Sequence, residues 1–311
     1  MSCEEMLEGV REGGLLPPGE PVVAMLSGGR DSTCLVDLAA RLLGSELVTA
    51  VHVNYRLRED SDEDEAFCEG LCERLGIGFE VERPRRPEGP GNLQSWARDQ
   101  RYAAAARLAL AEGARIATGH TADDQVETIL YRLASSPSRR ALLGMKPRDG
   151  SLMRPLLSFT RQETTAYCEE RGLGWRDDRT NEEAGYARNR VRNDLLPAFA
   201  EIHPAAARNV LRTAELLRDE AEVLDALVDA ELGDSNGSRG TISLQRLTEL
   251  PGAMRRLVVQ RLADRAAGRP VPGAANHADE VAALRRTGTA MLDLGSGVRA
   301  VVERGILHAE R

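Results

Sequence analysis

The sequence predicts an α/β protein, in which a parallel, Rossmann-like sheet with helices on both faces precedes a smaller, largely helical α+β domain. Short apolar runs alternate with amphipathic segments through the first 200 residues, which is typical of β–α–β units. The first apolar run leads directly into a Gly-Gly turn. The composition changes near His203-Pro204. We therefore expect one domain over residues 1–202 and a second over residues 203–311.

The expected elements of the first domain follow from β-branched apolar runs, helical spacing of apolar residues and glycines that end helices. The expected strands are Val22–Leu26, Glu46–Asn54, Gly78–Arg83 and Arg115–Thr118. The expected helices are Ser32–Leu43, Asp60–Leu75, Leu93–Ala111 and Thr121–Leu133. Ligands of such sheets bind beyond the carboxyl ends of the strands. The turns that follow the first and fourth strands are therefore expected to meet, although they are far apart in the sequence.

The second domain is expected to begin with a long helix, because Ala205–Leu232 carries apolar residues at helical spacing. Gly233–Gly240 is rich in Gly, Ser and Asn, which predicts a flexible loop. The remaining expected elements are the strand Thr241–Leu244, the helices Pro251–Arg265 and Ala278–Arg286, and a hairpin of Ala290–Leu294 and Val298–Glu303 around a Gly-Ser-Gly turn.

The composition narrows the class of protein. Hydrophobic residues make up 42% of the chain and no apolar run approaches 18 residues, so we expect neither a signal peptide nor a membrane span. Five cysteines without a C-x-x-C pair favour a reduced, cytoplasmic protein. The net charge of −8 argues against a uniformly basic nucleic-acid binder. Only Lys146 among the 41 basic residues is a lysine, and the forked guanidinium of arginine suits phosphate.

The turn after the first strand reads Ser27-Gly28-Gly29-Arg30-Asp31-Ser32. Two glycines allow close backbone approach to an anion, and the helix that follows directs free N–H groups at it. No Gly-Lys-Ser/Thr follows, so this is not a Walker A loop. The segment predicts a phosphate site.

A second segment, Gly119 to Thr128, joins a histidine to three carboxylates at the end of the fourth strand. Helix capping accounts for Thr121 and Asp124. It does not account for His120 or Glu127. Because Asp124 and Glu127 share a helix face, they would repel each other unless they held a cation, which could be a metal ion or an ammonium group.

Together these segments resemble the tRNA(Ile)-lysidine synthase family, a group of PP-loop ATP pyrophosphatases. The resemblance covers nearly the whole chain. Five further motifs share it, namely Ala97-Arg98-x-x-Arg101-Tyr102, Gly144-Met145, Arg154-Pro-Leu-Leu157, Asp178-x-Thr-Asn181 and Arg188-Asn-Arg-Val-Arg192.

The resemblance implies an ATP-dependent ligase that modifies the wobble cytidine of the isoleucine tRNA with a CAU anticodon. ATP would activate the C2 oxygen as an adenylate and release pyrophosphate. The ε-amine of free L-lysine would then attack C2 and expel AMP. The second domain would bind tRNA. Oligomeric state, monomer or homodimer, is left open.

The family also implies roles for the residues. The turn residues Ser27, Gly28, Gly29, Arg30, Asp31 and Ser32 would bind ATP, with Asp31 facing Mg²⁺ or the amine. Asp124 and Glu127 would hold lysine. His120 and Arg101 would stabilise developing charge. The predicted tRNA contacts are Arg98, Arg188 and Arg192; a charged helix face is the alternative for Arg188 and Arg192.

The chain departs from the family at two places. Arg30 replaces a small or apolar residue of the turn, where it would add a phosphate contact if it pointed inward. Ser135–Leu143 replaces a glycine-rich segment, and we assign this loop no role. Two other functions compete. Another PP-loop enzyme that modifies tRNA or adenylates a different group would keep the turn, although thiolases of that superfamily use paired cysteines. A non-catalytic ATP-binding module that contacts RNA would not need Asp31 with Asp124 and Glu127.

Overall fold

The computed structural model describes residues 1–57, 60–85, 87, 92–136, 139–176, 187–233 and 240–311. These form two compact units, Met1–Glu215 and Leu216–Arg311. The division falls inside the long helix α10 (Ala206–Glu231), whereas the sequence predicted it just before this helix. No described helix is both long enough and apolar enough to cross a bilayer.

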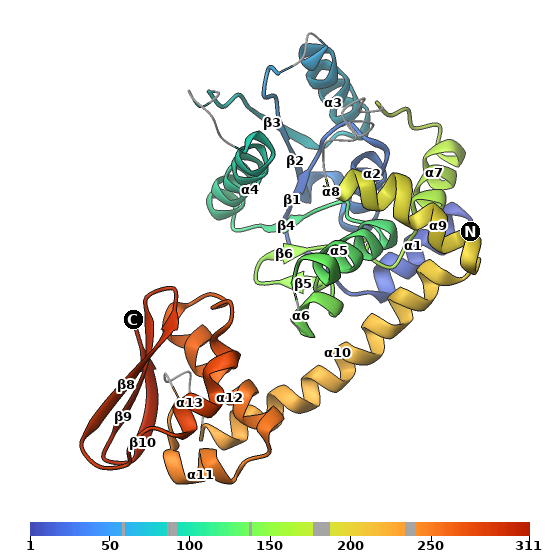
Figure 1. Ribbon diagram of the computed structural model, residues 1–311. Helices are drawn as coiled ribbons and strands as arrows, with labels where there is room; N and C mark the ends of the chain where they lie inside the picture. Colours follow the sequence, from blue (N-terminus) through green and yellow to red (C-terminus); the bar gives the residue numbers. More distant parts are fainter. Residues whose placement is uncertain (58–59, 86, 88–91, 137–138, 177–186, 234–239) are drawn as a thin grey trace. The chain divides into compact units, whose positions relative to one another are not determined.

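The first unit is built on a sheet in the order β3-β2-β1-β4-β6-β5, which is parallel except at β5 (Figure 1). The central strand β1 pairs in parallel with β2 and β4, and Val22 lies opposite both Val48 and Arg115. The strands are β1 (Val22–Met25), β2 (Val48–Val53), β3 (Gly78–Glu82), β4 (Arg115–Ala117), β5 (Arg148–Asp149) and β6 (Leu152–Met153). The predicted doubly covered parallel sheet is confirmed.

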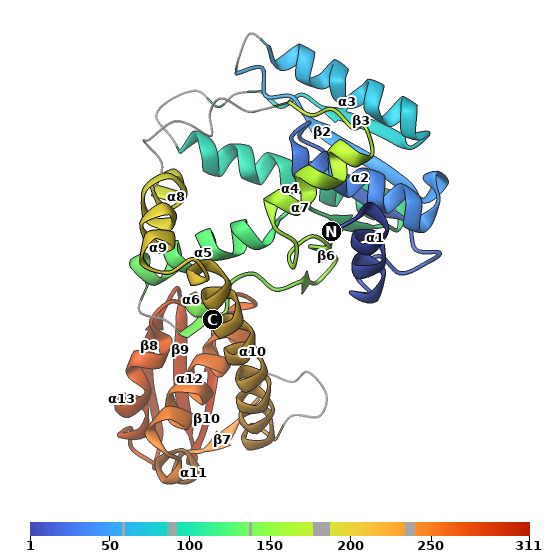
Figure 2. The same cartoon turned by 90° about the vertical axis from the view of Figure 1, so that its right-hand side faces the viewer.

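Alternate residues of β1 face two separate cores. Val22 and Ala24 pack in a core with helices α1 (Cys3–Glu12), α2 (Arg30–Leu43), α3 (Ser61–Leu75) and α7 (Arg161–Glu170). Val23 belongs to the core on the other face, under α4 (Leu93–Glu112). Figure 1 and Figure 2 together show α4 and α2 on opposite sides of the strands. The strand is therefore apolar on both sides, as a buried parallel strand requires.

Helix α5 (Ala122–Ser135) forms a third apolar cluster through Val126 and Leu130, with Val191 and the start of α10. The short α6 (Arg139–Leu142) lies in the loop that departs from the family pattern. The helical segment from α8 (Ala187–Arg190) through a π-turn at Val191–Leu195 to α9 (Leu196–Ile202) follows the undescribed residues.

Several elements of the first unit were missed or misplaced by the sequence analysis. The β5–β6 hairpin and the helices α1, α6, α7, α8 and α9 were not predicted. The start of the predicted strand Glu46–Asn54 is a 3₁₀ turn, Ser45–Leu47. The strands β5 and β6 have two residues each, and α7 is strongly polar, so the apolar periodicity of these three segments is weak. The motif Asp178-x-Thr-Asn181 lies outside the described residues.

The second unit has its own core, in which Leu244, Leu294 and Leu307 are buried. Its antiparallel sheet has the order β7-β10-β9-β8. The strands are β7 (Ile242–Ser243), β8 (Thr289–Gly295), β9 (Val298–Glu303) and β10 (Ile306–Glu310). The helices are the end of α10, α11 (Leu244–Glu249), α12 (Gly252–Ala267) and α13 (Ala278–Ala282), with a 3₁₀ turn at Ala274–His277. This confirms the α+β prediction, although α11 and β10 were not foreseen.

Candidate active site

The turn between β1 and α2 is shaped by its glycines and serines. Gly28 has φ +83°, in the left-handed region that glycine adopts without strain. Gly29 is the N-cap of α2 and has no side-chain capping bond. The Ser32 hydroxyl donates to the Gly29 carbonyl at 2.8 Å and lies 3.1 Å from Ser27 Oγ. The turn therefore presents hydroxyls and N–H groups at a helix N-terminus, an arrangement suited to phosphate.

Gly119, after β4, packs directly against this turn. A Cβ at Gly119 would lie 2.8 Å from the carbonyl oxygen of Asp31 and 3.0 Å from the Ser32 nitrogen. Only a residue without a side chain fits here. The structure thus brings together the two segments that the sequence analysis singled out.

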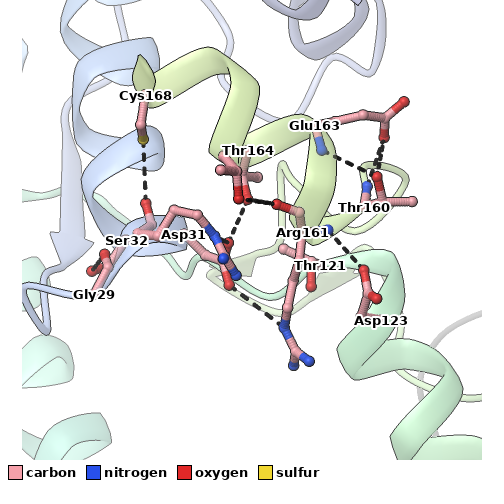
Figure 3. A network of polar contacts seen from close by, with 12 residues as sticks. Gly29, Asp31, Ser32, Thr121, Asp123, Thr160, Arg161, Glu163, Thr164 and Cys168 are labelled. Atoms are coloured by element: carbon pink, nitrogen blue, oxygen red, sulfur yellow. Dashed lines mark hydrogen bonds and ion pairs between the residues drawn. The ribbon is translucent and has the colours of Figure 1, made fainter. Parts of the chain in front are cut away.

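Arg161, at the start of α7, joins the carboxylates of both segments. Its guanidinium donates to Asp124 Oδ1 at 2.5 Å and to Glu127 Oε1 at 2.9 Å. It also lies 3.9 Å from Asp31 Oδ2. Its backbone N–H donates to Asp123 Oδ2 at 2.7 Å (Figure 3). The cation that the paired carboxylates require is therefore supplied by the protein.

Asp31 is held on its other side by α7. Thr164 donates its hydroxyl to Asp31 Oδ1 at 2.5 Å, as Figure 3 shows. The Arg30 side chain folds back onto the same oxygen at 3.1 Å, although the sequence analysis placed it among the ATP ligands. Asp31 retains 21% exposure of its side chain, so one edge of the carboxylate faces solvent.

Glu127 is the most buried of these carboxylates, with 4% of its side chain exposed. Arg192 binds it through two contacts, Nε to Oε1 at 2.7 Å and Nη2 to Oε2 at 3.0 Å. The structure therefore places Arg192, a predicted tRNA contact, on the acidic cluster. Arg188 lies in α8, and its side chain is outside what the structure describes.

The charges around this cluster control its protonation. Burial alone would raise the pKa of Asp124, but Arg161 and the Thr121 N–H hold it below its ordinary value. Burial would likewise lower the pKa of Arg161, and Asp124 and Glu127 together raise it instead. Both groups therefore stay ionised at neutral pH.

His120 lies beside a group of arginines. Burial, opposed by Asp124 and assisted by Arg154, Arg98 and Arg101, lowers the pKa of His120 to about 4. The ring is therefore neutral at pH 7. Within the described residues, none of these three arginines is paired with a carboxylate. Together they form an electropositive region that can accept an anion.

These arginines differ in their surroundings. Arg98 and Arg101 are exposed on α4, where Arg98 lies over the Tyr102 ring, 4.7 Å from its centroid. Arg154 is 6% exposed. Its Nη1 donates to the Lys146 carbonyl at 2.6 Å, and its Nε is buried with no partner in the described structure. A buried donor without a partner is unusual in a folded protein.

Comparison with known proteins assigns this site to a family. The PP-loop domain family matches residues 12–199, which include both segments. A tRNA(Ile)-lysidine synthase of Symbiobacterium thermophilum is 38% identical, over 96% of this chain and 68% of that protein. The chain belongs to the tRNA(Ile)-lysidine synthase family.

Other lysidine synthases give the same result. That of Thermus thermophilus is 39% identical over 82% of this chain, and that of Nostoc is 33% identical over 81%. The chain spans about half the length of the Thermus relative, since the match covers 51% of it. Among solved structures, the U34-tRNA thiolase NcsA of Methanococcus maripaludis has a TM-score of 0.58 at 19% identity, covering 69% of this chain and 78% of that one. This likeness concerns the fold.

The lysidine synthase motifs also have structural explanations. Gln125 and Met145 exchange two hydrogen bonds, Nε2 to the Met145 carbonyl at 2.9 Å and the Met145 N–H to Oε1 at 2.6 Å. Gly144 has φ +64°, and a Cβ there would lie 2.5 Å from Gln125 Oε1. Gly144-Met145 therefore anchors α5, which carries Asp124 and Glu127.

The described residues offer few protein ligands for a magnesium ion at this site. Among the described residues, no cluster of three or more His, Cys, Asp or Glu side chains is arranged to hold a metal. Asp31 presents a single partly exposed carboxylate beside the phosphate-binding turn. This fits a Mg²⁺ ion bound mainly by substrate phosphates and water with one protein carboxylate.

The sequence analysis missed three residues of this site, namely Arg161, Thr164 and Arg154, and it counted Asp123 among the three carboxylates without giving it a role. Arg154 stood in a motif but received no role. Arg161 begins a helix with a Thr160-x-x-Glu163 capping box, and this pattern could have located α7. No local pattern could have shown that α7 packs against Asp31.

Proposed function

We propose that this protein is an ATP-dependent lysidine synthase, which joins L-lysine to the wobble cytidine of a CAU-anticodon isoleucine tRNA. The observation that carries this proposal is the position of Asp31, Asp124 and Glu127 around Arg161, directly beside the phosphate-binding turn. An activated phosphate and an amine can therefore meet within one site. The compartment we propose is the cytoplasm.

The first step would be adenylation. The C2 oxygen of cytidine would bond to the α-phosphorus of ATP, and the bond to the β-phosphate oxygen would break. The turn residues Ser27 to Ser32 would hold the leaving pyrophosphate, with Asp31 as the one protein ligand of its Mg²⁺. His120, Arg101 and Arg154 would stabilise charge on the α-phosphate and the C2 oxygen.

The second step would be attack by lysine. The ε-nitrogen would bond to C2 and lose a proton, while the bond from C2 to the phosphorylated oxygen breaks and AMP leaves. Asp124 and Glu127 would hold the ammonium groups of lysine, and their present partners Arg161 and Arg192 would have to share or release them. Arg98, Arg188 and Arg192 remain proposed tRNA contacts.

The experiment that tests this proposal is ATP-dependent transfer of radiolabelled lysine to a CAU-anticodon isoleucine tRNA transcript. The elongator methionine tRNA is the control for specificity. We expect transfer to the isoleucine transcript alone and its loss in Asp31→Asn. The matched control is Asp149→Asn, an exposed carboxylate on β5, which should transfer lysine normally.

The alternatives predict different results. Pyrophosphate release without lysine transfer would indicate another PP-loop enzyme. A folded protein with neither activity would indicate a non-catalytic module. A thiolase is disfavoured because all five cysteines are buried. Burial raises the pKa of Cys3 to about 11 and that of Cys72 to about 12, so these thiols do not form the nucleophilic thiolate that sulfur transfer needs.

A further inference from the structure

Thr118, the residue that follows β4, contacts the ring of His120. Its Oγ1 lies 2.7 Å from His120 Nδ1 and 3.5 Å from the Met153 carbonyl. Thr118 is 3% exposed, so its hydroxyl has no access to bulk water. Its hydrogen bonds must therefore be made within the protein.

Two arrangements of hydrogens are compatible with these positions. In the first, the Thr118 hydroxyl donates to Nδ1, and the ring proton is on Nε2. In the second, Nδ1–H donates to Thr118, and the hydroxyl turns to the Met153 carbonyl.

The distances favour the first arrangement. A separation of 2.7 Å is optimal for a hydroxyl donor, whereas 3.5 Å is at the limit of a hydrogen bond. The Met153 carbonyl already accepts the Thr118 N–H at 3.0 Å, so it does not require the hydroxyl. The first arrangement satisfies the Thr118 hydroxyl, His120 Nδ1 and the Met153 carbonyl with short bonds.

The other ring nitrogen is available to substrate. Within the described residues, Nε2 has no hydrogen-bond partner. The charged groups that influence the ring are Asp124 on α5, Arg154 after β6, and Arg98 and Arg101 on α4. Three of these four are cations, which disfavour a second proton on the imidazole.

We propose that Thr118 is a positioning residue that donates to Nδ1 and holds His120 as the neutral Nε2–H tautomer, so that His120 acts as a hydrogen-bond donor to a substrate oxygen. In this role it neither takes nor gives up a proton during the reaction. Only the identity of the oxygen, on the α-phosphate or at cytidine C2, rests on the proposed function.

The direct test is ¹⁵N NMR of the full chain labelled at histidine, with the His120 signals assigned by their loss in His120→Gln. We expect a pyridine-type Nδ1 and a pyrrole-type Nε2 at neutral pH. Thr118→Ser should keep this pattern, and the nearly isosteric Thr118→Val should lose it. A pyrrole-type Nδ1 in the wild-type protein would overturn the proposal.

The same samples can identify the acceptor. Addition of Mg²⁺ and an α,β-methylene ATP analogue should shift the Nε2 signal if the acceptor is on the nucleotide. A shift that requires the tRNA as well would indicate the C2 oxygen. No shift with either ligand would contradict a donor role. These measurements do not depend on lysine transfer, so they separate this proposal from the proposed function.

Kinetics provide a second readout. Thr118→Val should lower kcat of the reaction roughly 10- to 100-fold, as the loss of an orienting partner does, and Thr118→Ser should restore most of it. His120→Gln can place an amide N–H near the Nε2 position and does not titrate, so it should be more active than His120→Ala. If both His120 variants were equally inactive, a proton-transfer role would replace the donor role.

Discussion

Arg161 connects three carboxylates that come from two different helices. Asp31 lies on α2, and Asp124 and Glu127 lie on α5. Each of these acids would be costly to bury without a cation. Arg161 therefore holds these two helices together, and in the proposed reaction it would have to rearrange for a lysine ammonium to reach the same carboxylates.

At the residue scale, Arg161→Met should lower the free energy of unfolding by about 2 kcal/mol, less than for a fully buried ion pair because the side chain is partly exposed. Urea denaturation at pH 7 measures this. The matched control is Arg107→Met, since Arg107 pairs with Glu82 on the surface at 59% exposure and should cost less than about 1 kcal/mol. Equal losses in the two variants would contradict the structural role of Arg161.

His120 makes stability depend on pH. Its folded-state pKa of about 4 lies below the ordinary 6.5, so the unfolded chain binds the proton first as pH falls. Above pH 6.5 the ring is neutral in both the folded and the unfolded chain, and the stability is at its full value. As pH falls from 6.5 toward 4, only the unfolded chain takes up the proton, and up to about 3 kcal/mol of the free energy of unfolding is lost.

The measurement is urea denaturation of the wild type and of His120→Gln between pH 7 and 4. The variant should lose less stability over this range, because glutamine cannot bind the proton. His203→Gln, at an exposed position after α9, should follow the wild-type curve. If His120→Gln followed it as well, His120 would not have the lowered pKa.

At the scale of elements, the site depends on the close approach of the β4 end to the start of α2. This approach places His120 beside the phosphate-binding turn. The contact is between backbones, at Gly119 and at Asp31 and Ser32. It leaves no space for a side chain.

Gly119→Ala should therefore displace the turn, lower the free energy of unfolding by about 1–3 kcal/mol and weaken ATP binding. Calorimetric titration with ATP and urea denaturation measure the two effects. Gly70→Ala is the control, because Gly70 lies inside α3 and a Cβ there meets nothing within 4 Å. This change should stabilise α3 by about 0.5–1 kcal/mol. Unchanged ATP binding in Gly119→Ala would show that the turn tolerates the displacement.

At the scale of the whole molecule, each unit has its own apolar core. Leu307→Ala, at a 1% exposed position in the second core, should cost about 2–5 kcal/mol. We expect faster hydrogen exchange within residues 216–311 and unchanged ATP binding by residues 1–215. Faster exchange at β1 or α2 would show instead that the two cores unfold together.

Much of the fold was predictable because its elements carry strong local signals. The predicted Ala205–Leu232 helix corresponds to α10, and Val298–Glu303 is β9 without change. Helix α7 was missed because its sequence is polar and only three of its residues are buried. The third strand of the terminal meander, β10, follows a turn at Arg304 and Gly305 that was not recognised.

Local sequence was enough to predict the alternation of strands and helices, the glycine turn suited to phosphate, and the need for a cation at Asp124 and Glu127. These follow from local geometry and charge, which involve neighbouring residues only. The tertiary structure alone decided which cation is present, because Arg161 reaches these carboxylates only after α7 has packed on α2. It also decided that His120 is neutral, since burial and the charges of Arg154, Arg98 and Arg101 arise only on folding.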